Sequence, residues 1–200
     1  MGASEQSTGD KGRDRLVRLL GYNESLSLDD RGRFRLPDQM ANALQREMGR
    51  VSDSSSPAPY ERLALYFVPG TRERIFLYPA PNIQLAIDRF ENPPPGMEPD
   101  VIRRARDYFY YRMRFVEADK QNRFLIPEGL REHAGIDEEV EQITVVAHNH
   151  WLSLSRSDRE EQRAMENLEA FESAAPDLLN PVYPTPPLPT EAAPEGDEHP

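Results

Sequence analysis

The sequence contains no cysteine, two lysines and one tryptophan among its 200 residues. The absence of cysteine excludes disulfides, zinc sites with cysteine ligands and thiol catalysis. The longest apolar run, residues 63–68, is too short to cross a bilayer. The first twenty residues mix acidic and basic side chains where a signal peptide needs an apolar stretch. We therefore expect a cytoplasmic protein without a membrane partner.

Hydrophobic residues are also scarce, at 38% of the chain with a mean hydropathy of -0.74, whereas prolines number 19. A chain of this length can form one or two domains, and this composition indicates that part of it stays outside a packed core. Eight of the prolines lie in residues 173–200, which predicts a disordered tail with a PxxP-type peptide ligand as an alternative use.

The formal net charge of -11 argues at first against a nucleic-acid partner. The charge is unevenly distributed, because residues 1–18, 19–172 and 173–200 carry +1, -7 and -5 respectively. About half of the excess negative charge therefore lies in the predicted tail. Of the 24 basic residues 22 are arginine, whose planar guanidinium favours bidentate contacts.

A duplicated motif divides the chain into two similar halves. Residues 27–37, SLDDRGRFRLP, align with residues 117–127, EADKQNRFLIP, in the shared pattern D-x-x-x-R-F-x-[LI]-P. We interpret the chain as a tandem repeat. The predicted parts are an N-terminal tail (1–18), a first repeat (19–91) with an insertion (52–59), a linker (92–99), a second repeat (100–172) and the Pro-rich tail (173–200).

Each copy of the motif predicts a tight turn followed by a strand. The aspartate side chain can accept the N–H groups of its own turn, and Gly or Asn three residues later tolerates a positive φ. These turn residues are Asp29, Gly32, Asp119 and Asn122. Each strand ends at a proline, Pro37 or Pro127, whose fixed φ suits the start of a helix.

Apolar periodicity predicts the remaining elements. Strands are expected at residues 63–68, 75–78, 114–118, 140–147 and 150–154, and amphipathic helices at 83–90 and 101–113. Ser157 and Glu160 are spaced as a capping box that would begin the last helix.

The second motif copy, DKQNRFLIPEGLR, resembles the signature of the AbrB/SpoVT swapped-hairpin family, and the tandem arrangement resembles the MraZ family of bacterial transcriptional regulators. The resemblance covers about residues 20–172. It implies an α+β fold in which two β-barrel-like swapped-hairpin repeats with short helices form a pseudo-dimer within one chain. Two positions depart from the family pattern: Asn122 replaces the expected glycine, and lysine is replaced by Arg31 in the first copy and Gln121 in the second.

The resemblance also implies a function. Such a protein would assemble as a homo-oligomeric ring, bind G-rich direct repeats in double-stranded DNA at the D-x-x-x-R edges and regulate the division and cell-wall gene cluster in association with the nucleoid. The motif residues carried over are Asp29, Arg33, Asp119 and Arg123.

The arrangement of basic residues in the first motif also indicates that the D-x-x-x-R edge binds DNA. Arg31, Arg33 and Arg35 alternate with residues of the opposite strand face, which would place three guanidiniums together for phosphate or guanine contacts. The expected DNA-binding set is Arg31, Arg33, Arg35, Lys120 and Arg123. In the alternative interpretation, Arg33 and Arg123 only pair with Asp29 and Asp119 to pin each turn.

Other candidate residues favour structural roles. His148 and His150 could share a strand face, but Asn149 suggests a hairpin turn, and we expect no metal site and no cofactor. His133 suits a helix end, and the aromatic residues 108–111 suit packing better than base stacking.

No nucleophile elbow, P-loop or dinucleotide motif is present, so we expect no enzyme and no small-molecule substrate. The second hypothesis is a ring-forming structural or interaction protein with little affinity for DNA.

Overall fold

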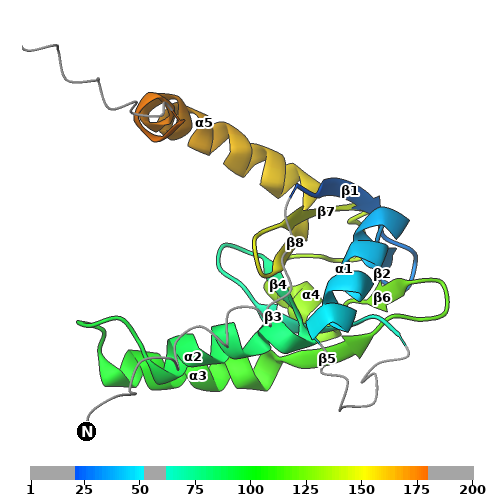
Figure 1. Ribbon diagram of the computed structural model, residues 1–200, viewed down its shortest axis with the longest axis horizontal. Coiled ribbons are helices and arrows are strands. Elements are labelled where there is room, and N and C mark those ends of the chain that lie inside the picture. The colour runs from blue at the N-terminus through cyan, green and yellow to red at the C-terminus, as the bar shows by residue number, and fades with distance from the viewer. Residues whose placement is uncertain (1–20, 52–61, 180–200) are drawn as a thin grey trace, which may run out of the picture. The chain divides into compact units, whose positions relative to one another are not determined.

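The computed structural model describes residues 21–51 and 62–179 (Figure 1). The chain divides into two units, residues 1–161 and 162–200. Unit 1 contains every described strand and helices α1 to α4, and unit 2 contains the part of helix α5 beyond residue 161. The predicted N-terminal tail and the insertion at 52–59 lie outside the described residues.

Unit 1 is built around an antiparallel sheet of six strands in the order β1-β7-β8-β4-β3-β5. Its strands are β1 (Asn23–Ser27), β3 (Ala64–Pro69), β4 (Ile75–Pro79), β5 (Arg114–Glu117), β7 (Gln142–Ala147) and β8 (Leu152–Arg156). A separate antiparallel pair joins β2 (Arg33–Arg35) to β6 (Arg123–Leu125). The fold is therefore α+β, as predicted.

The described strands do not close into the barrel that we expected. β1 and β5 form the two edges of the six-stranded sheet and do not pair with each other. The strands that follow them, β2 and β6, leave the sheet and pair together instead. The predicted barrel is thus replaced by an open sheet with a two-stranded ribbon beside it.

Strand pairing crosses between the two halves of the chain. β1 of the first half pairs with β7 of the second, whereas β5 of the second half pairs with β3 of the first. β4 and β8 join the halves at the middle of the sheet. Burial of the main core therefore requires both halves.

Five α-helices occur among the described residues. They are α1 (Asp38–Val51), α2 (Ile83–Glu91), α3 (Pro99–Arg112), α4 (Glu128–His133) and α5 (Ser157–Leu179), with a short 3-10 turn, η2 (Ala80–Asn82), before α2. Figure 1 shows α2 and α3 side by side. α1 and α4 follow Pro37 and Pro127 as predicted, with Pro127 as the N-cap of α4. α5 continues to Leu179, past residue 172 where we expected the tail to begin, and residues 180–200 lie outside the described residues.

Three phenylalanines form the centre of the main core. Phe34 stacks on Phe124 with ring centroids 5.8 Å apart, and Phe67 lies 6.3 Å and 5.9 Å from these two rings. All three side chains are buried, each contributing about 1.5–3 kcal/mol of hydrophobic stabilisation. Because Phe34 and Phe124 belong to β2 and β6, this core fixes the ribbon against the rest of unit 1.

Ser157 and Glu160, the predicted capping pair, connect the start of α5 to the sheet. Ser157 Oγ forms hydrogen bonds with Thr144 Oγ1 at 2.9 Å and with Ser25 Oγ at 3.1 Å. The Glu160 carboxylate accepts hydrogen bonds from Arg74 Nη2 at 2.7 Å and from Ser155 Oγ at 2.8 Å. Both residues therefore bond to side chains of other elements, which their spacing in the sequence did not indicate.

Candidate nucleic-acid interface

The first D-x-x-x-R turn is held together by its own aspartate. Asp29 Oδ1 accepts hydrogen bonds from the backbone N–H groups of Arg31 at 3.0 Å and Arg33 at 2.9 Å. Its other oxygen, Oδ2, accepts from both Nε and Nη2 of Arg33 at 2.7 Å. One carboxylate therefore closes the turn and fixes the arginine that follows it.

The second turn repeats this geometry. Asp119 Oδ1 accepts from the backbone N–H groups of Gln121 at 2.8 Å and Arg123 at 3.0 Å, and Oδ2 accepts from Arg123 Nε and Nη2 at 2.8 Å. Gly32 and Asn122 adopt φ values of 70° and 58° at equivalent positions. Both turns thus need a residue that tolerates the left-handed region, as the sequence predicted.

Both motif strands pair in one antiparallel ribbon. Its register places Arg33 opposite Leu125, Phe34 opposite Phe124 and Arg35 opposite Arg123. Phe34 and Phe124 point into the core, so the opposite face carries Arg33, Arg35 and Arg123. Arg31 and Lys120 lie exposed in the two turns that precede the strands. The structure therefore brings all five predicted cationic residues onto one ribbon and its turns.

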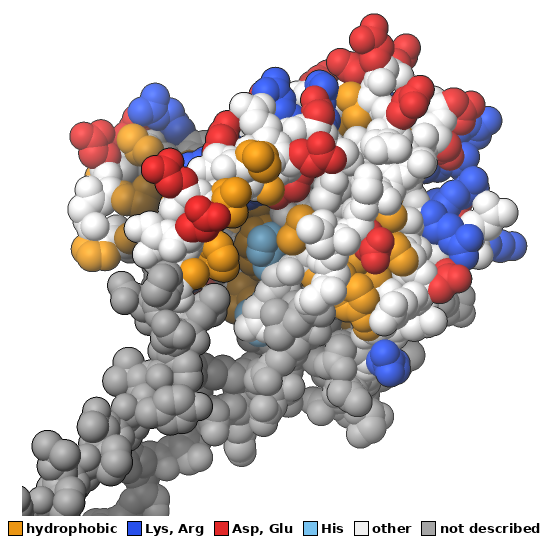
Figure 2. All heavy atoms as spheres, turned by 90° about the horizontal axis from the view of Figure 1, so that it is seen from above, with side chains coloured by type: hydrophobic (Ala, Val, Ile, Leu, Met, Phe, Trp, Pro, Cys, Tyr) orange, Lys and Arg blue, Asp and Glu red, His pale blue; other side chains and the backbone are white. Residues whose placement is uncertain are grey.

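Carboxylates already bind three of these five cations. Arg33 and Arg123 pair with the aspartates of their turns, and Arg35 Nη2 contacts Asp38 Oδ1 at 2.8 Å. The Arg35 side chain is nevertheless 58% exposed, compared with 24% for Arg33. Within the described residues, neither the Arg31 guanidinium nor the Lys120 ammonium group forms an ion pair with a carboxylate, although the Arg31 backbone N–H donates to Asp29. In Figure 2, Lys and Arg side chains gather at the right of the view with acidic side chains beside them.

The turn aspartates are tuned to remain ionised. Desolvation raises the pKa of Asp29, but hydrogen bonds from Arg33 and from the Arg31 backbone lower it by more, so the pKa lies below its ordinary value. The same balance, with Arg123 and the Gln121 backbone as donors, lowers the pKa of Asp119. Both turns therefore keep their ion pairs at neutral pH.

Arg131 of α4 lies beside the first turn, a position that sequence reasoning missed. A Cβ on Gly32 would lie 3.0 Å from Arg131 Nη1, so this turn packs closely on the guanidinium. Arg131 Nε is buried and has no hydrogen-bond partner among the described residues. Both residues line a cavity of about 430 Å³ that also contains Asp29 and Arg31. Only the fold brings this arginine to the turn, because it lies 99 positions from Gly32 in the sequence.

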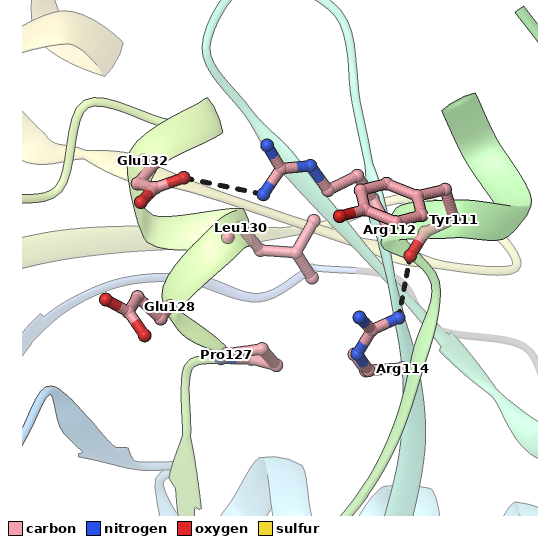
Figure 3. A pocket seen from close by; sticks show the side chains of 8 residues that line it. Tyr111, Arg112, Arg114, Pro127, Glu128, Leu130 and Glu132 are labelled. Atoms are coloured by element: carbon pink, nitrogen blue, oxygen red, sulfur yellow. Dashed lines mark hydrogen bonds and ion pairs between the residues drawn. The ribbon is translucent and has the colours of Figure 1, made fainter.

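A second cavity of about 330 Å³ lies between α4 and the junction of α3 with β5 (Figure 3). Arg112 Nη1 reaches Glu132 at 3.5 Å, and Arg114 Nη1 donates to the Tyr111 carbonyl at 2.8 Å. Gly129 leaves the space that Arg112 Nη1 occupies. Because Glu128 and Glu132 also line this cavity, its charges are mixed and it offers no concentrated cationic surface.

The predicted histidine candidates have structural partners. His148 stacks on Trp151 at 3.9 Å and bonds Ser153 Oγ at 3.0 Å, while residues 148–151 connect β7 to β8 as the expected hairpin. Burial, with the Arg74 charge, lowers the pKa of His148. His133 Nε2 contacts the Gly70 carbonyl at 2.8 Å, and its Nδ1 contacts Tyr108 OH at 3.0 Å. Among residues 21–51 and 62–179, no cluster of three or more potential metal ligands occurs.

No helix in the described part of the chain is both long and apolar enough to cross a bilayer.

The chain was compared with protein families and with individual proteins of known class. No protein-family profile matches the chain. The chain is similar to a transcriptional regulator, with 30% identity over 95 residues. That relative is the transcriptional regulator MraZ of Lachnoclostridium phytofermentans, and the match covers 48% of this chain and 63% of the relative. The chain therefore spans less than two thirds of the length of this relative, and the similarity agrees with the resemblance to the MraZ family that the motifs indicated.

Proposed function

We propose that this protein is a transcriptional regulator that binds double-stranded DNA through the β2–β6 ribbon. The observation that carries the proposal is the convergence of both D-x-x-x-R motifs on one ribbon with its arginines on the outer face. Similarity to the MraZ regulator supports the same class of function. By the same resemblance, the proposal is that this protein binds G-rich direct repeats, regulates the division and cell-wall gene cluster and associates with the nucleoid.

A two-stranded ribbon with arginines on one face is suited to contact with the major groove. A two-stranded antiparallel ribbon fits the major groove, and arginine binds the O6 and N7 atoms of guanine in bidentate fashion. Arg35 is the most exposed of the three strand arginines, at 58%, so we assign it to base contact. Arg31 and Lys120 in the flanking turns are assigned to phosphates. Asp29 and Asp119 hold Arg33 and Arg123 in fixed orientations, which lowers the entropy that binding costs.

Because the charges on one ribbon nearly cancel, strong binding to DNA would require the ribbons of several subunits to bind at once. Five cations are offset by Asp29, Asp30, Asp38 and Asp119, so a single ribbon attracts phosphate weakly. A ring that presents the same ribbon to consecutive repeats raises the effective concentration of every ribbon after the first has bound. We therefore propose a homo-oligomeric ring as the DNA-binding form.

The proposal includes a tandem swapped-hairpin architecture with repeats at residues 19–91 and 100–172. It is supported by the exchange of first strands, since β1 pairs with β7 and β5 pairs with β3. The pairing of β2 from the first half with β6 from the second half also supports this architecture, because each half contributes one strand to the ribbon.

The alternative function is a ring-forming interaction protein with little affinity for DNA. Two observations favour it: the carboxylates already bound to Arg33, Arg35 and Arg123, and the net charge of -11. The two functions differ in whether the ribbon binds duplex DNA in a salt-dependent manner.

A mobility-shift titration over a salt series tests the proposal. Duplexes with G-rich direct repeats are compared with duplexes of equal length and scrambled sequence. The double variant Arg31→Ala/Lys120→Ala should bind more weakly and lower the salt slope by about 0.9 for each phosphate that the variant no longer neutralises. Arg89→Ala on α2 is the control, because it removes an exposed arginine outside the ribbon. Absence of any shift at low salt would favour the interaction protein.

A further inference from the structure

Leu125 is an apolar residue on the otherwise cationic face of the β2–β6 ribbon. Its side chain is 50% exposed, whereas Phe124 beside it is buried. On the two strands of the ribbon, both of which the structure describes in full, no other large apolar side chain is exposed. A single exposed leucine is ordinary on a protein surface, so the informative observation is its place on this face.

The duplicated motif gives the two strands of the ribbon the same residues except at one position. β2 reads RFR and β6 reads RFL, so that Arg35 of the first strand corresponds to Leu125 of the second. A ribbon with two identical strands would have no preferred direction along a duplex, because its symmetry would match that of a palindrome. The difference between Arg35 and Leu125 gives the outer face a direction.

The neighbours of Leu125 on this face are guanidinium groups. Leu125 lies directly opposite Arg33, whose guanidinium is held by Asp29 Oδ2 at 2.7 Å. Arg35 lies diagonally across the ladder from Leu125, since its direct partner is Arg123. Side chains at directly opposite positions are about 4.5–5.5 Å apart, and diagonal positions about 7–8 Å. A ligand that these arginines bind would therefore also cover Leu125.

The chemistry of the major groove selects one partner for a leucine in this position. Phosphate oxygens and the edges of guanine, adenine and cytosine offer polar groups, and a leucine packed against them would bury a donor or acceptor without a partner. The C5-methyl group of thymine is the apolar group that base edges present in this groove. Contact between a leucine and that methyl group removes apolar surface of both from water.

We propose that Leu125 contacts the C5-methyl group of a thymine and thereby selects this base. The inference rests on the proposed binding of DNA by the ribbon, and it adds a residue that determines sequence specificity. The diagonal of about 7–8 Å between Leu125 and Arg35 spans roughly two base steps. The selected thymine therefore lies about two base pairs from the guanine assigned to Arg35.

Replacement of thymine by deoxyuridine tests the contact, because it removes the methyl group and leaves the base pair intact. The wild-type protein first selects duplexes from a pool that is randomised around G-rich direct repeats. Each thymine position is then converted to deoxyuridine in every repeat, and affinity is measured by fluorescence anisotropy. At one position the wild type should bind at least about fourfold more weakly, the factor that burial of one methyl group corresponds to. In Leu125→Ala the same conversion should leave the affinity unchanged.

Two further variants sharpen the comparison. Leu168→Ala on α5 is the matched control, because this leucine is 45% exposed and lies outside the ribbon, and it should retain the wild-type ratio of the two affinities. Each variant is compared with itself on the two duplexes, so a change in overall affinity cancels. Leu125→Arg gives β6 the residue that β2 carries, and it should change the preferred base at that position from thymine to guanine. Circular dichroism verifies that each variant is folded.

Three outcomes would overturn the contact. The first is a wild type that binds the thymine and deoxyuridine duplexes equally at every position, and the second is a selected site without thymine about two base pairs from a required guanine. The third is a Leu125→Ala variant that responds to deoxyuridine as the wild type does, which would show that Leu125 only packs on Arg33. Salt-dependent binding by the wild type in each case would leave the regulator function intact. Absence of any binding at low salt would instead refute that function.

Discussion

Arg35 and Arg123 lie directly opposite each other in the β2–β6 ladder, and each guanidinium is bound by a different carboxylate, Asp38 and Asp119, at 2.8 Å. Like charges at opposite positions destabilise an antiparallel pair. The aspartates therefore allow two arginines to occupy one face of the ribbon. The same carboxylates also reduce the attraction of that face for phosphate, so stability and the proposed affinity for DNA would depend on the same ion pairs.

Removing one carboxylate from the first turn should separate its effect on stability from its effect on DNA affinity. Asp29→Asn and Asp30→Asn each delete one negative charge from the first turn, but only Asp30→Asn leaves the orientation of Arg33 intact, so Asp30→Asn should tighten DNA binding at low salt. Only Asp29→Asn should lower the thermal unfolding midpoint, because Asp29 alone of the two accepts hydrogen bonds from Arg33 and the Arg31 backbone. Equal unfolding midpoints for both variants would contradict the role assigned to Asp29.

The pH dependence of stability should report the turn aspartates. Their pKa values are lowered in the folded state, so their stabilisation is complete above the unfolded pKa of about 3.9 and is lost as pH falls through the lower folded pKa. Chemical unfolding between pH 7 and pH 3 is the measurement. The wild type should lose more stability below about pH 4 than Asp29→Asn/Asp119→Asn, in which these two carboxyl groups no longer titrate. Parallel curves would rule out this contribution.

The first turn requires glycine because Gly32 packs against Arg131, whereas the second turn has asparagine at the equivalent position. Gly32→Ala should destabilise the protein by about 1–2 kcal/mol, because alanine at a φ of 70° is strained and its Cβ would approach Arg131 Nη1 at 3.0 Å. Asn122→Gly keeps the allowed conformation and should change stability by about 0.5 kcal/mol or less. Urea unfolding of both variants distinguishes these effects. A neutral Gly32→Ala variant would contradict the close packing on Arg131.

The aromatic centre should dominate the stability of the ribbon. Phe34→Ala removes a side chain that is 1% exposed and stacked on Phe124, and it should cost about 3–5 kcal/mol. Leu125→Ala, on the outer face of the same ribbon and 50% exposed, should cost about 0.5 kcal/mol or less. Comparable losses at both positions would indicate that the outer face is buried in an assembly, which analytical ultracentrifugation at the same concentrations would detect.

Local patterns in the amino-acid sequence predicted the two D-x-x-x-R turns, the alternation of arginine and buried phenylalanine, and the helices that follow Pro37 and Pro127. These features rest on contacts within about four residues, on strand period and on the fixed φ of proline, all of which are local. The resemblance to the MraZ family followed from the same local motifs.

The way in which these turns, strands and helices pack together follows from the three-dimensional fold. It paired β2 with β6, exchanged β1 and β5 between the halves, opened the expected barrel into a sheet and brought Arg131 beside Gly32. Such contacts join residues about 50 to 120 positions apart, and their partners are selected by burial of a shared core that no local pattern encodes.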